Sequence, residues 1–405
     1  MTRQATNDNE KVAEAGRRGS DVRADCWVKI SLTDSGGIDL QLKTKVESMY
    51  GEATRQLVRD ELGALGVKHA KVEIEDVGAM PFVTTARVEA AVRRLGLEVG
   101  DCYVPDFAAG TQYGTERDRF RRSRLYLPGN EAKFMINAGL HRPDGIILDL
   151  EDSVAASEKD AARLVVRNAL RTINFHPAER MVRINQGDRG LEDLDFVVPH
   201  NLHVVLIPKV EDPAQVRQVD ERIKEILSAH DIDRPVYLMP IVESALGAIK
   251  AYEIATASPN ICALTIGLED YTADLGTHRT NEGRESFWAR CQVVNAARAA
   301  GVQPIDTVFS DVADMEGLRN SVLEAKSLGF DGKGCIHPRQ ITVIHEAFAP
   351  SEVELAKAKR IVEAFEEAER RGLGVVSLGS KMIDPPVVKR AQRTIKLAEA
   401  MGGAQ

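Results

Sequence analysis

The sequence predicts an α/β fold: a (β/α)8 barrel with a small α+β domain before it and a helical extension after it. Three observations lead to this prediction. Short apolar runs recur eight times between residues 122 and 348, and most are separated by segments long enough for a helix. The runs are continuously apolar, as in parallel strands covered on both faces. Eight such units in succession fit a closed barrel, although a doubly wound sheet is the alternative.

The first part of the chain divides into three segments. Residues 1–25 are polar, and we expect them to be disordered. Residues 26–98 form a compact α+β pattern, and residues 99–121 gather Gly, Pro and charge as a linker. Within 26–98 we expect strands at 26–32, 37–44 and 70–76 and helices at 46–65 and 86–96.

The barrel is predicted over residues 122–348. Its eight expected strands are RLYLPG (124–129), GIILDLED (145–152), RMVRIN (180–185), HVVLIPKVE (203–211), VYLMPIVES (236–244), CALTIGLED (262–270), VQPIDTVF (302–309) and GKGCIHP (332–338). Residues 349–405 are expected to form two helical stretches around GVVSLGSKMIDPPVV.

Composition and charge exclude several classes of protein. The net charge of −8 argues against binding to nucleic acid or to an anionic membrane. Five scattered cysteines without a CxxC pair argue against a zinc site or a disulfide framework. The polar N-terminus lacks the apolar core of a signal peptide, and no run approaches the ~20 apolar residues of a membrane span. We therefore expect a cytoplasmic protein.

Charged residues follow the expected strands, at the end of a barrel where active sites form. Carboxylates that share a cleft repel each other, and hard oxygen ligands suit Mg²⁺ or Mn²⁺. We expect Glu243 and Asp270 to be the metal ligands, with Glu151 and Asp152 holding metal-bound water. The alternative is that these acids stabilise the N-termini of the following helices.

Two basic residues also end strands. Arg183 would polarise a carbonyl or hold a carboxylate, or else form a salt bridge with the acids of 149–152. Lys209 would be a structural counter-ion, because the neighbouring Glu211 is expected to keep its amine charged and so disfavours a Schiff base. His337 fits either a catalytic residue or a packed loop residue.

At these residues the sequence resembles a known family. SRLYLPGN, GIILDLEDSV, MVRIN, LIPKVE, PIVESALG, GLEDYTADLG and GKGCIHPRQ follow in order over residues 122–395. They resemble the citrate lyase β-subunit and the malyl-CoA and citramalyl-CoA lyases of the HpcH/HpaI aldolase superfamily. The resemblance implies a TIM barrel, Mg²⁺, a CoA thioester substrate and C–C bond cleavage. It places the metal ligands at Glu243 and Asp270 and the substrate-polarising arginine at Arg183.

The resemblance extends to the C-terminal segment and to substrate binding. GSKMIDPPVVKRAQ resembles a segment whose aspartate, here Asp384, acts in a neighbouring subunit, which implies a homo-oligomer, a trimer or hexamer. From the residues alone, Asp384 is only a turn former. The resemblance assigns Arg124 and Asn130 to substrate or CoA binding. Lys133 would replace an arginine that many relatives carry after PGN or PGS.

The N-terminal domain has a resemblance of its own, to the citrate lyase γ-subunit, an acyl carrier protein. Such a carrier bears a CoA-derived arm on a serine before its first strand. When this chain is aligned with the carrier without gaps, Arg23 occupies the place of that serine. Ser20 occupies it only if residues are inserted after Ser20. The arm would give a tethered acyl group a high effective concentration at its own barrel. The alternative is a carrier fold kept for docking or assembly.

These resemblances imply a Mg-dependent lyase. It would cleave a citryl-, citramalyl- or malyl-type 3-hydroxyacyl thioester to an acetyl thioester and a 2-oxo acid. The alternatives are a malyl-CoA thioesterase, a class II pyruvate aldolase acting on free 2-oxo acids, or a non-catalytic scaffold.

Overall fold

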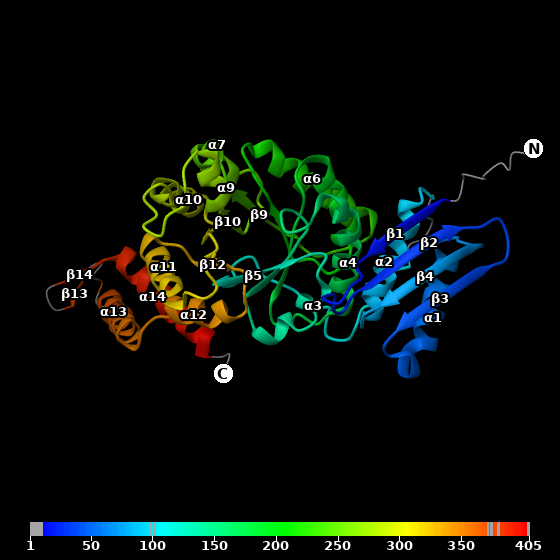
Figure 1. The fold of residues 1–405 in the computed structure, drawn as a ribbon. Helices are drawn as coiled ribbons and strands as arrows, with labels where there is room; N and C mark the ends of the chain where they lie inside the picture. The colour runs from blue at the N-terminus through cyan, green and yellow to red at the C-terminus, as the bar shows by residue number, and fades with distance from the viewer. Residues whose placement is uncertain are drawn as a thin grey trace, which may run out of the picture.

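A four-stranded sheet, a closed barrel and a C-terminal helical pair follow one another along the chain in the computed structural model (Figure 1). The structure describes residues 11–97, 99, 103–370, 372, 376–378 and 381–402. The N-terminal sheet and the C-terminal helices lie at opposite sides of the barrel (Figure 1).

The N-terminal sheet has the strand order β1-β2-β4-β3, with β3 and β4 parallel and the other pairs antiparallel. Its elements are β1 (Val12–Gly16), β2 (Cys26–Leu32), β3 (Ile38–Thr44), α1 (Glu47–Ala64), β4 (Ala70–Asp76) and α2 (Pro81–Arg94). These positions confirm the strands and helices expected within 26–98, except that α2 begins at Pro81, before the expected start at residue 86, and ends at Arg94.

The expectation that residues 1–25 are disordered is wrong where the structure describes them. Residues 12–16 form β1, which pairs along its whole length with β2. Buried and exposed residues alternate along β1, but the buried side chains are small: Ala13 and Ala15 are buried, while Val12 and Glu14 are exposed. Residues 1–10 lie outside the described part of the chain.

The barrel closes with eight parallel strands, which confirms the predicted architecture over a doubly wound sheet. The strands are β5 (Ser123–Pro128), β6 (Gly145–Asp149), β7 (Glu179–Arg183), β8 (Val204–Ile207), β9 (Tyr237–Val242), β10 (Ala263–Ile266), β11 (Gln303–Asp306) and β12 (Gly332–Cys335). The helices between and after them are α3 (Ala132–Met135), η1 (Ala138–His141), η2 (Ala156–Glu158), α4 (Lys159–Thr172), α5 (Gly187–Val197), α6 (Pro213–Ala229), α7 (Ala245–Ile249), α8 (Ala251–Ala255), α9 (Leu268–Asp274), α10 (Phe287–Ala300), α11 (Met315–Leu328) and α12 (Arg339–Phe348).

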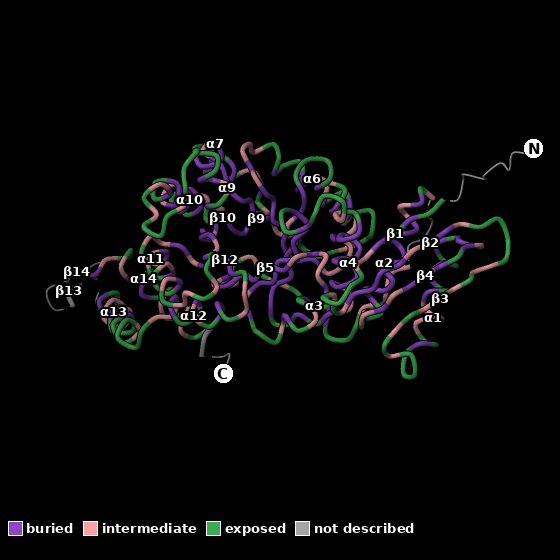
Figure 2. The backbone as a smooth tube through the Cα atoms, in the orientation of Figure 1, coloured by how far each residue is buried: buried purple, intermediate pink, exposed green. Residues whose placement is uncertain are grey.

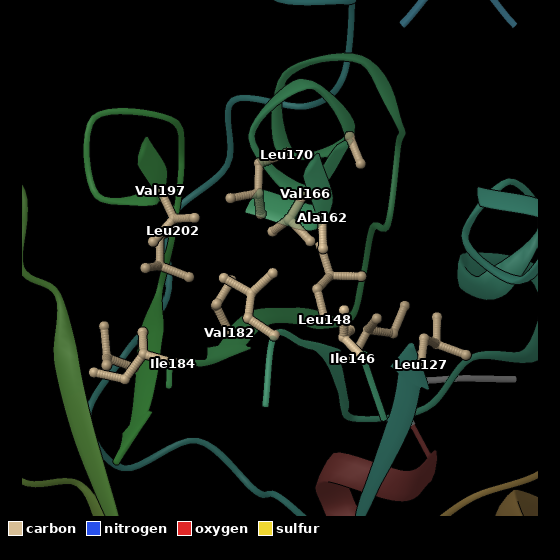
Figure 3. Packing of buried hydrophobic residues seen from close by; sticks show 14 of the residues in the cluster. Leu127, Ile146, Leu148, Ala162, Val166, Leu170, Val182, Ile184, Val197 and Leu202 are labelled. Carbon is tan, nitrogen blue, oxygen red and sulfur yellow. The ribbon is translucent and has the colours of Figure 1, made fainter. Parts of the chain in front are cut away.

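Two apolar layers stabilise the barrel. One fills its interior and includes Ile147, Met181 and Met239. The other lies between strands and helices, where Val166 and Leu170 of α4 face the strand residue Val182 (Figure 3). Buried chain follows the strands, and exposed chain follows the outer surfaces of the helices and the loops (Figure 2). The carboxyl ends of the strands are thereby held in fixed positions.

The segment before β5 has neither helix nor strand over residues 103–121, as expected of a connection. It is nevertheless fixed to the barrel at the amino ends of the strands. Arg121 is buried and forms a bidentate ion pair with Glu179, at 2.6 and 2.8 Å. Arg117 donates to the backbone oxygen of Ile261. The connection therefore covers the end of the barrel opposite to the charged rim.

The C-terminal part contains α13 (Glu352–Arg370), the hairpin β13 (Val376–Leu378) and β14 (Lys381–Ile383), and α14 (Pro385–Gly402). The helices pack through a small cluster of their own that includes Ile361 and Val388. None of the helices in the described part of the chain combines the length and apolar character needed to cross a bilayer.

Candidate active site

A cavity of about 380 Å³ opens at the carboxyl ends of the barrel strands. Its lining includes residues of β5, β6, β7, β9 and β10 and of the loops that follow β10 and β11. Five residues of the predicted site line it: Arg124, Asp152, Arg183, Glu243 and Asp270. The structure therefore brings both expected metal ligands and the expected arginine to one cavity.

Glu243 follows the last residue of β9 and is only 5 % exposed. Its Oε2 atom finds no hydrogen-bond donor among the described residues. Burial raises the pKa of Glu243 to about 8; Arg183 opposes this shift, and the negative charges of Glu151 and Asp270 add to it. A Cβ at Gly267 would lie 2.7 Å from Glu243 Oε1, so glycine there leaves room for this carboxylate.

Asp270 lies in the first turn of α9, and its side chain is 43 % exposed. Its Oδ1 atom is 3.3 Å from Lys209 Nζ, which is also 3.6 Å from Glu151 and 3.7 Å from Asp152. Partial burial opposes the charged amine of Lys209, but these three carboxylates raise its pKa above the ordinary value.

Lys209 is thus a counter-ion, as expected, but the expected partner is wrong. Its ion pairs are with Glu151 and Asp152, in the loop after β6, and with Asp270 of α9, rather than with Glu211. Its φ of 48° is uncommon for a residue with a side chain.

Arg183 is the last residue of β7 and forms a bidentate pair with Asp149, with both N···O distances at 2.7 Å. Its Nη1 atom lies 2.8 Å from Glu151 and 3.4 Å from Asp152. Burial alone would lower the pKa of the guanidinium, but the hydrogen-bonded Asp149 and the charge of Glu151 raise it. The salt bridge expected for Arg183 is present, and the residue also lines the cavity.

No separate role was expected for Asp149 from the sequence, yet its carboxylate fixes the orientation of Arg183. The two residues are register partners in the parallel pair of β6 and β7, so their side chains leave neighbouring strands at the same level. The sequence shows only that an acid and a base each end a strand. That Asp149 pairs with Arg183 follows only once the register of β6 and β7 is known.

The three residues assigned to substrate or CoA binding lie in different places. Arg124 is buried at the floor of the cavity, with Nη1 3.0 Å from Met239 Sδ and Nη2 3.1 Å from Thr265 Oγ1. Asn130 and Lys133 are not among the residues that line the cavity. Lys133 lies 3.0 Å from Glu131, so its charge is already offset.

Asp384 and Ser20 both lie away from this cavity. Asp384 accepts a hydrogen bond from the Val387 amide at the start of α14, and β14 lies at the edge of the molecule far from the barrel centre (Figure 1). Ser20 is exposed in the loop between β1 and β2, and its hydroxyl is 3.4 Å from Asp21.

The chemistry of the donors fits a hard divalent cation. Among residues with a described position, no three His, Cys, Asp or Glu side chains converge as a complete metal site. Glu243 and Asp270 supply two carboxylates, one of them buried without a donor, and oxygen atoms of water and substrate could complete a magnesium shell. Glu151 and Asp152 lie at the same rim but are already engaged by Arg183 and Lys209.

Comparison with known proteins identifies the barrel. Residues 122–338 match the family model described as HpcH/HpaI aldolase/citrate lyase, and residues 11–95 match the model described as malonate decarboxylase delta subunit (MdcD), an acyl-carrier model. Citrate lyase subunit beta of Haemophilus influenzae is 43% identical over 285 residues, which cover 70% of this chain and 98% of that protein. Human mitochondrial citramalyl-CoA lyase is 34% identical over 69% of this chain and 86% of its own length.

A solved structure agrees with these matches. Protein CitE of Mycobacterium tuberculosis, in complex with magnesium, acetoacetate and coenzyme A, is 31% identical with a TM-score of 0.57. The match covers 70% of this chain and 100% of that one. This chain therefore belongs to the HpcH/HpaI aldolase/citrate lyase family.

Proposed function

We propose that this chain is a magnesium-dependent lyase. It cleaves a carboxylate-bearing 3-hydroxyacyl thioester to an acetyl thioester and a 2-oxo acid. The observation that carries the proposal is the Glu243 carboxylate, whose buried Oε2 atom has no donor among the described residues, in a cavity that also contains Arg183 and Asp270. Relatives named citrate lyase subunit beta, citramalyl-CoA lyase and L-malyl-CoA/beta-methylmalyl-CoA lyase support this class of substrate.

Glu243 and Asp270 would hold the magnesium ion, and Glu151 and Asp152 would hold its water. A magnesium ion bound there acts as a Lewis acid and template for the oxygens of the hydroxyacyl group. Because burial raises the pKa of Glu243, this carboxyl releases a proton when it becomes a ligand.

Arg183 would stabilise the enolate oxygen of the acetyl thioester that forms as the C–C bond breaks. Such stabilisation requires a donor whose orientation is fixed before the reaction. The bidentate pair with Asp149 supplies that fixed orientation. Arg124, at the cavity floor, would contact the acyl group.

Asp384 would exchange a proton with the enolate carbon. Since Asp384 of the same chain lies outside the cavity, we assign this role to the copy in a neighbouring subunit, in a trimer or hexamer. Strand β14, which Asp384 directly follows, lies at the edge of the molecule, where a second copy could contact it (Figure 1).

The thioester would be carried either by free CoA or by an arm on Ser20 of the acyl-carrier-like domain. The exposure of Ser20 in its loop favours attachment of such an arm. Intact-mass measurement of the protein from its native host tests whether such an arm is attached, because a prosthetic arm on Ser20 adds a fixed mass to the protein.

Product analysis tests the reaction itself. With malyl-CoA or citramalyl-CoA and Mg²⁺, we expect acetyl-CoA together with glyoxylate or pyruvate. Free CoA together with an intact hydroxy acid would instead identify a thioesterase. Aldol products from pyruvate and small aldehydes, without action on a thioester, would identify a pyruvate aldolase.

A further inference from the structure

The N-terminal domain shares its core with the barrel. Helix α2 lies between the N-terminal sheet and α4, and every residue from 82 to 92 is buried. One continuous hydrophobic cluster contains Val28 of β2, Val88 of α2 and Val166 of α4. A carrier domain joined only by a flexible linker would not bury a helix on all sides, so this domain is docked.

Buried polar contacts fix the orientation of the docked domain. Glu89 of α2 forms an ion pair with Arg167 of α4 at 2.6 Å, and both side chains are almost completely buried. Asn168 Nδ2 donates to the Thr85 hydroxyl and to the Phe82 backbone oxygen, each at 3.0 Å. Such directional contacts permit one orientation of α2 against α4.

A second set of contacts, which we call the rim contact, joins the domain to the loop after β5. Asp25 forms a bidentate pair with Arg87, with both distances at 2.9 Å and both side chains 1 % exposed. Arg87 also donates to the backbone oxygen of Asn130 at 3.1 Å. Arg17 forms ion pairs with Glu131 and with Asp25.

The rim contact lies at the end of the barrel where the cavity opens. The loop with Asn130 and Glu131 follows the carboxyl end of β5, and the loop between β1 and β2 reaches it beside α3 (Figure 1). Within the described chain, the Oδ1 atom of Asn130 is buried without a hydrogen-bond partner, so this loop keeps an unsatisfied acceptor beside the rim contact, although Asn130 itself does not line the cavity.

One of the compared relatives has almost no length left to match this domain. The Haemophilus influenzae protein aligns over 98% of its length while covering 70% of this chain, which leaves no counterpart for the N-terminal domain. In this chain the loop after β5 is therefore held by a part that this relative lacks.

We propose that the N-terminal domain is a fixed support for the loop after β5, at the end of the barrel where the cavity opens, and that Arg17 and Arg87 are positioning residues for this loop. Through this loop they set the position of Asn130 for the thioester substrate. The proposal rests on the proposed function only for the identity of that substrate. It also places the loop with Ser20 permanently at its own barrel.

Arg17→Ala provides the test, because Arg17 is 34 % exposed and its loss does not leave Asp25 without Arg87. The matched control is Arg18→Ala, in the same loop, since Arg18 contacts Glu75 and Trp27 inside the N-terminal domain. Glu131→Gln removes the charge that pairs with Arg17 from the other side of the rim contact. Hydrogen–deuterium exchange of residues 128–135 and steady-state kinetics with citramalyl-CoA or malyl-CoA are measured for each variant.

For Arg17→Ala and Glu131→Gln we expect about tenfold faster exchange in 128–135 and an increase in KM of about fivefold, with kcat within about twofold. The double variant should add little to either single variant. Unchanged exchange, or equal acceleration in Arg18→Ala, would overturn the role of the rim contact in holding this loop. Faster exchange with an unchanged KM would overturn the positioning role. Because exchange is measured without substrate, a failure of the proposed reaction would not obscure the result.

Discussion

Two acids at the same end of the barrel have opposite surroundings. Asp306 ends β11 and is fully buried, with Lys333 at 2.7 Å and Arg290 at 3.1 Å. Burial would raise the pKa of Asp306, but these two cations lower it below the ordinary value. Glu243, which follows β9 and is almost as deeply buried, has no such partner in the described part of the chain, and its pKa rises to about 8.

Both acids are buried, so burial alone does not distinguish a binding site from a structural ion pair. The difference is that Asp306 has cationic partners, whereas Glu243 leaves an oxygen that no described residue engages, free for a ligand. A wider hollow of about 800 Å³ lies beside Asp306 and includes Arg290, Lys333 and Glu324. Its buried charges are already paired with one another. The smaller cavity contains the unpaired carboxylate, and for that reason we place the chemistry there.

The largest effect is expected from Glu243→Gln, which keeps the size of the side chain and removes its charge. Loss of a metal ligand should lower kcat/KM about 10³-fold, since the ion supplies several kcal/mol to the transition state. Stability of the metal-free protein should not fall. Glu269→Gln is the control, because Glu269 is 59 % exposed and paired with Arg279. Retained turnover in Glu243→Gln would reject the metal site.

The opposite behaviour is expected at the paired acid. Asp306→Asn leaves Lys333 buried without its counter-charge and Arg290 with only Glu324, and we expect the free energy of unfolding to fall by about 3–5 kcal/mol. Urea unfolding measures this loss. A double variant, Asp306→Asn with Lys333→Met, should recover part of it. A single variant as stable as the original protein would show that this ion pair is not a structural requirement.

The features that could be predicted from sequence are those encoded locally. Continuous Val, Ile and Leu runs located all eight barrel strands, and the acids at their ends located the cavity. The pairing of Asp149 with Arg183 and of Lys209 with Asp270 depends on strand register and on backbone direction, which no local pattern reveals. The docking of the N-terminal domain was missed for the same reason. Glu89 and Arg87 look like surface charges in sequence, and their partners are distant.

A smaller effect is expected from Lys209→Met, which removes the cation that now offsets the rim carboxylates. Lys209 lies within 3.3–3.7 Å of Glu151, Asp152 and Asp270, so its charge opposes the approach of a divalent cation. We expect Mg²⁺ to bind about tenfold more tightly to the metal-free variant, as measured by calorimetry. Lys250→Met is the control, because Lys250 pairs with Asp212. Unchanged or weaker Mg²⁺ binding in Lys209→Met would contradict this account.

The smallest effect is a pH dependence that Glu243 should impose and Asp306 should not. The pKa of Glu243 in the folded protein, about 8, lies above its ordinary value of 4.5. Between these values the folded state holds a proton that the unfolded state has lost, so the stability of the metal-free protein should decrease as pH rises through this window. Mg²⁺ must displace the same proton, and its affinity should rise about fivefold between pH 7 and pH 8. Calorimetry in buffers of different ionisation enthalpy would count the released proton. Both trends should vanish in Glu243→Gln and persist in Asp306→Asn, and a pH-independent affinity in the unmodified protein would mean that Glu243 is already ionised before the ion arrives.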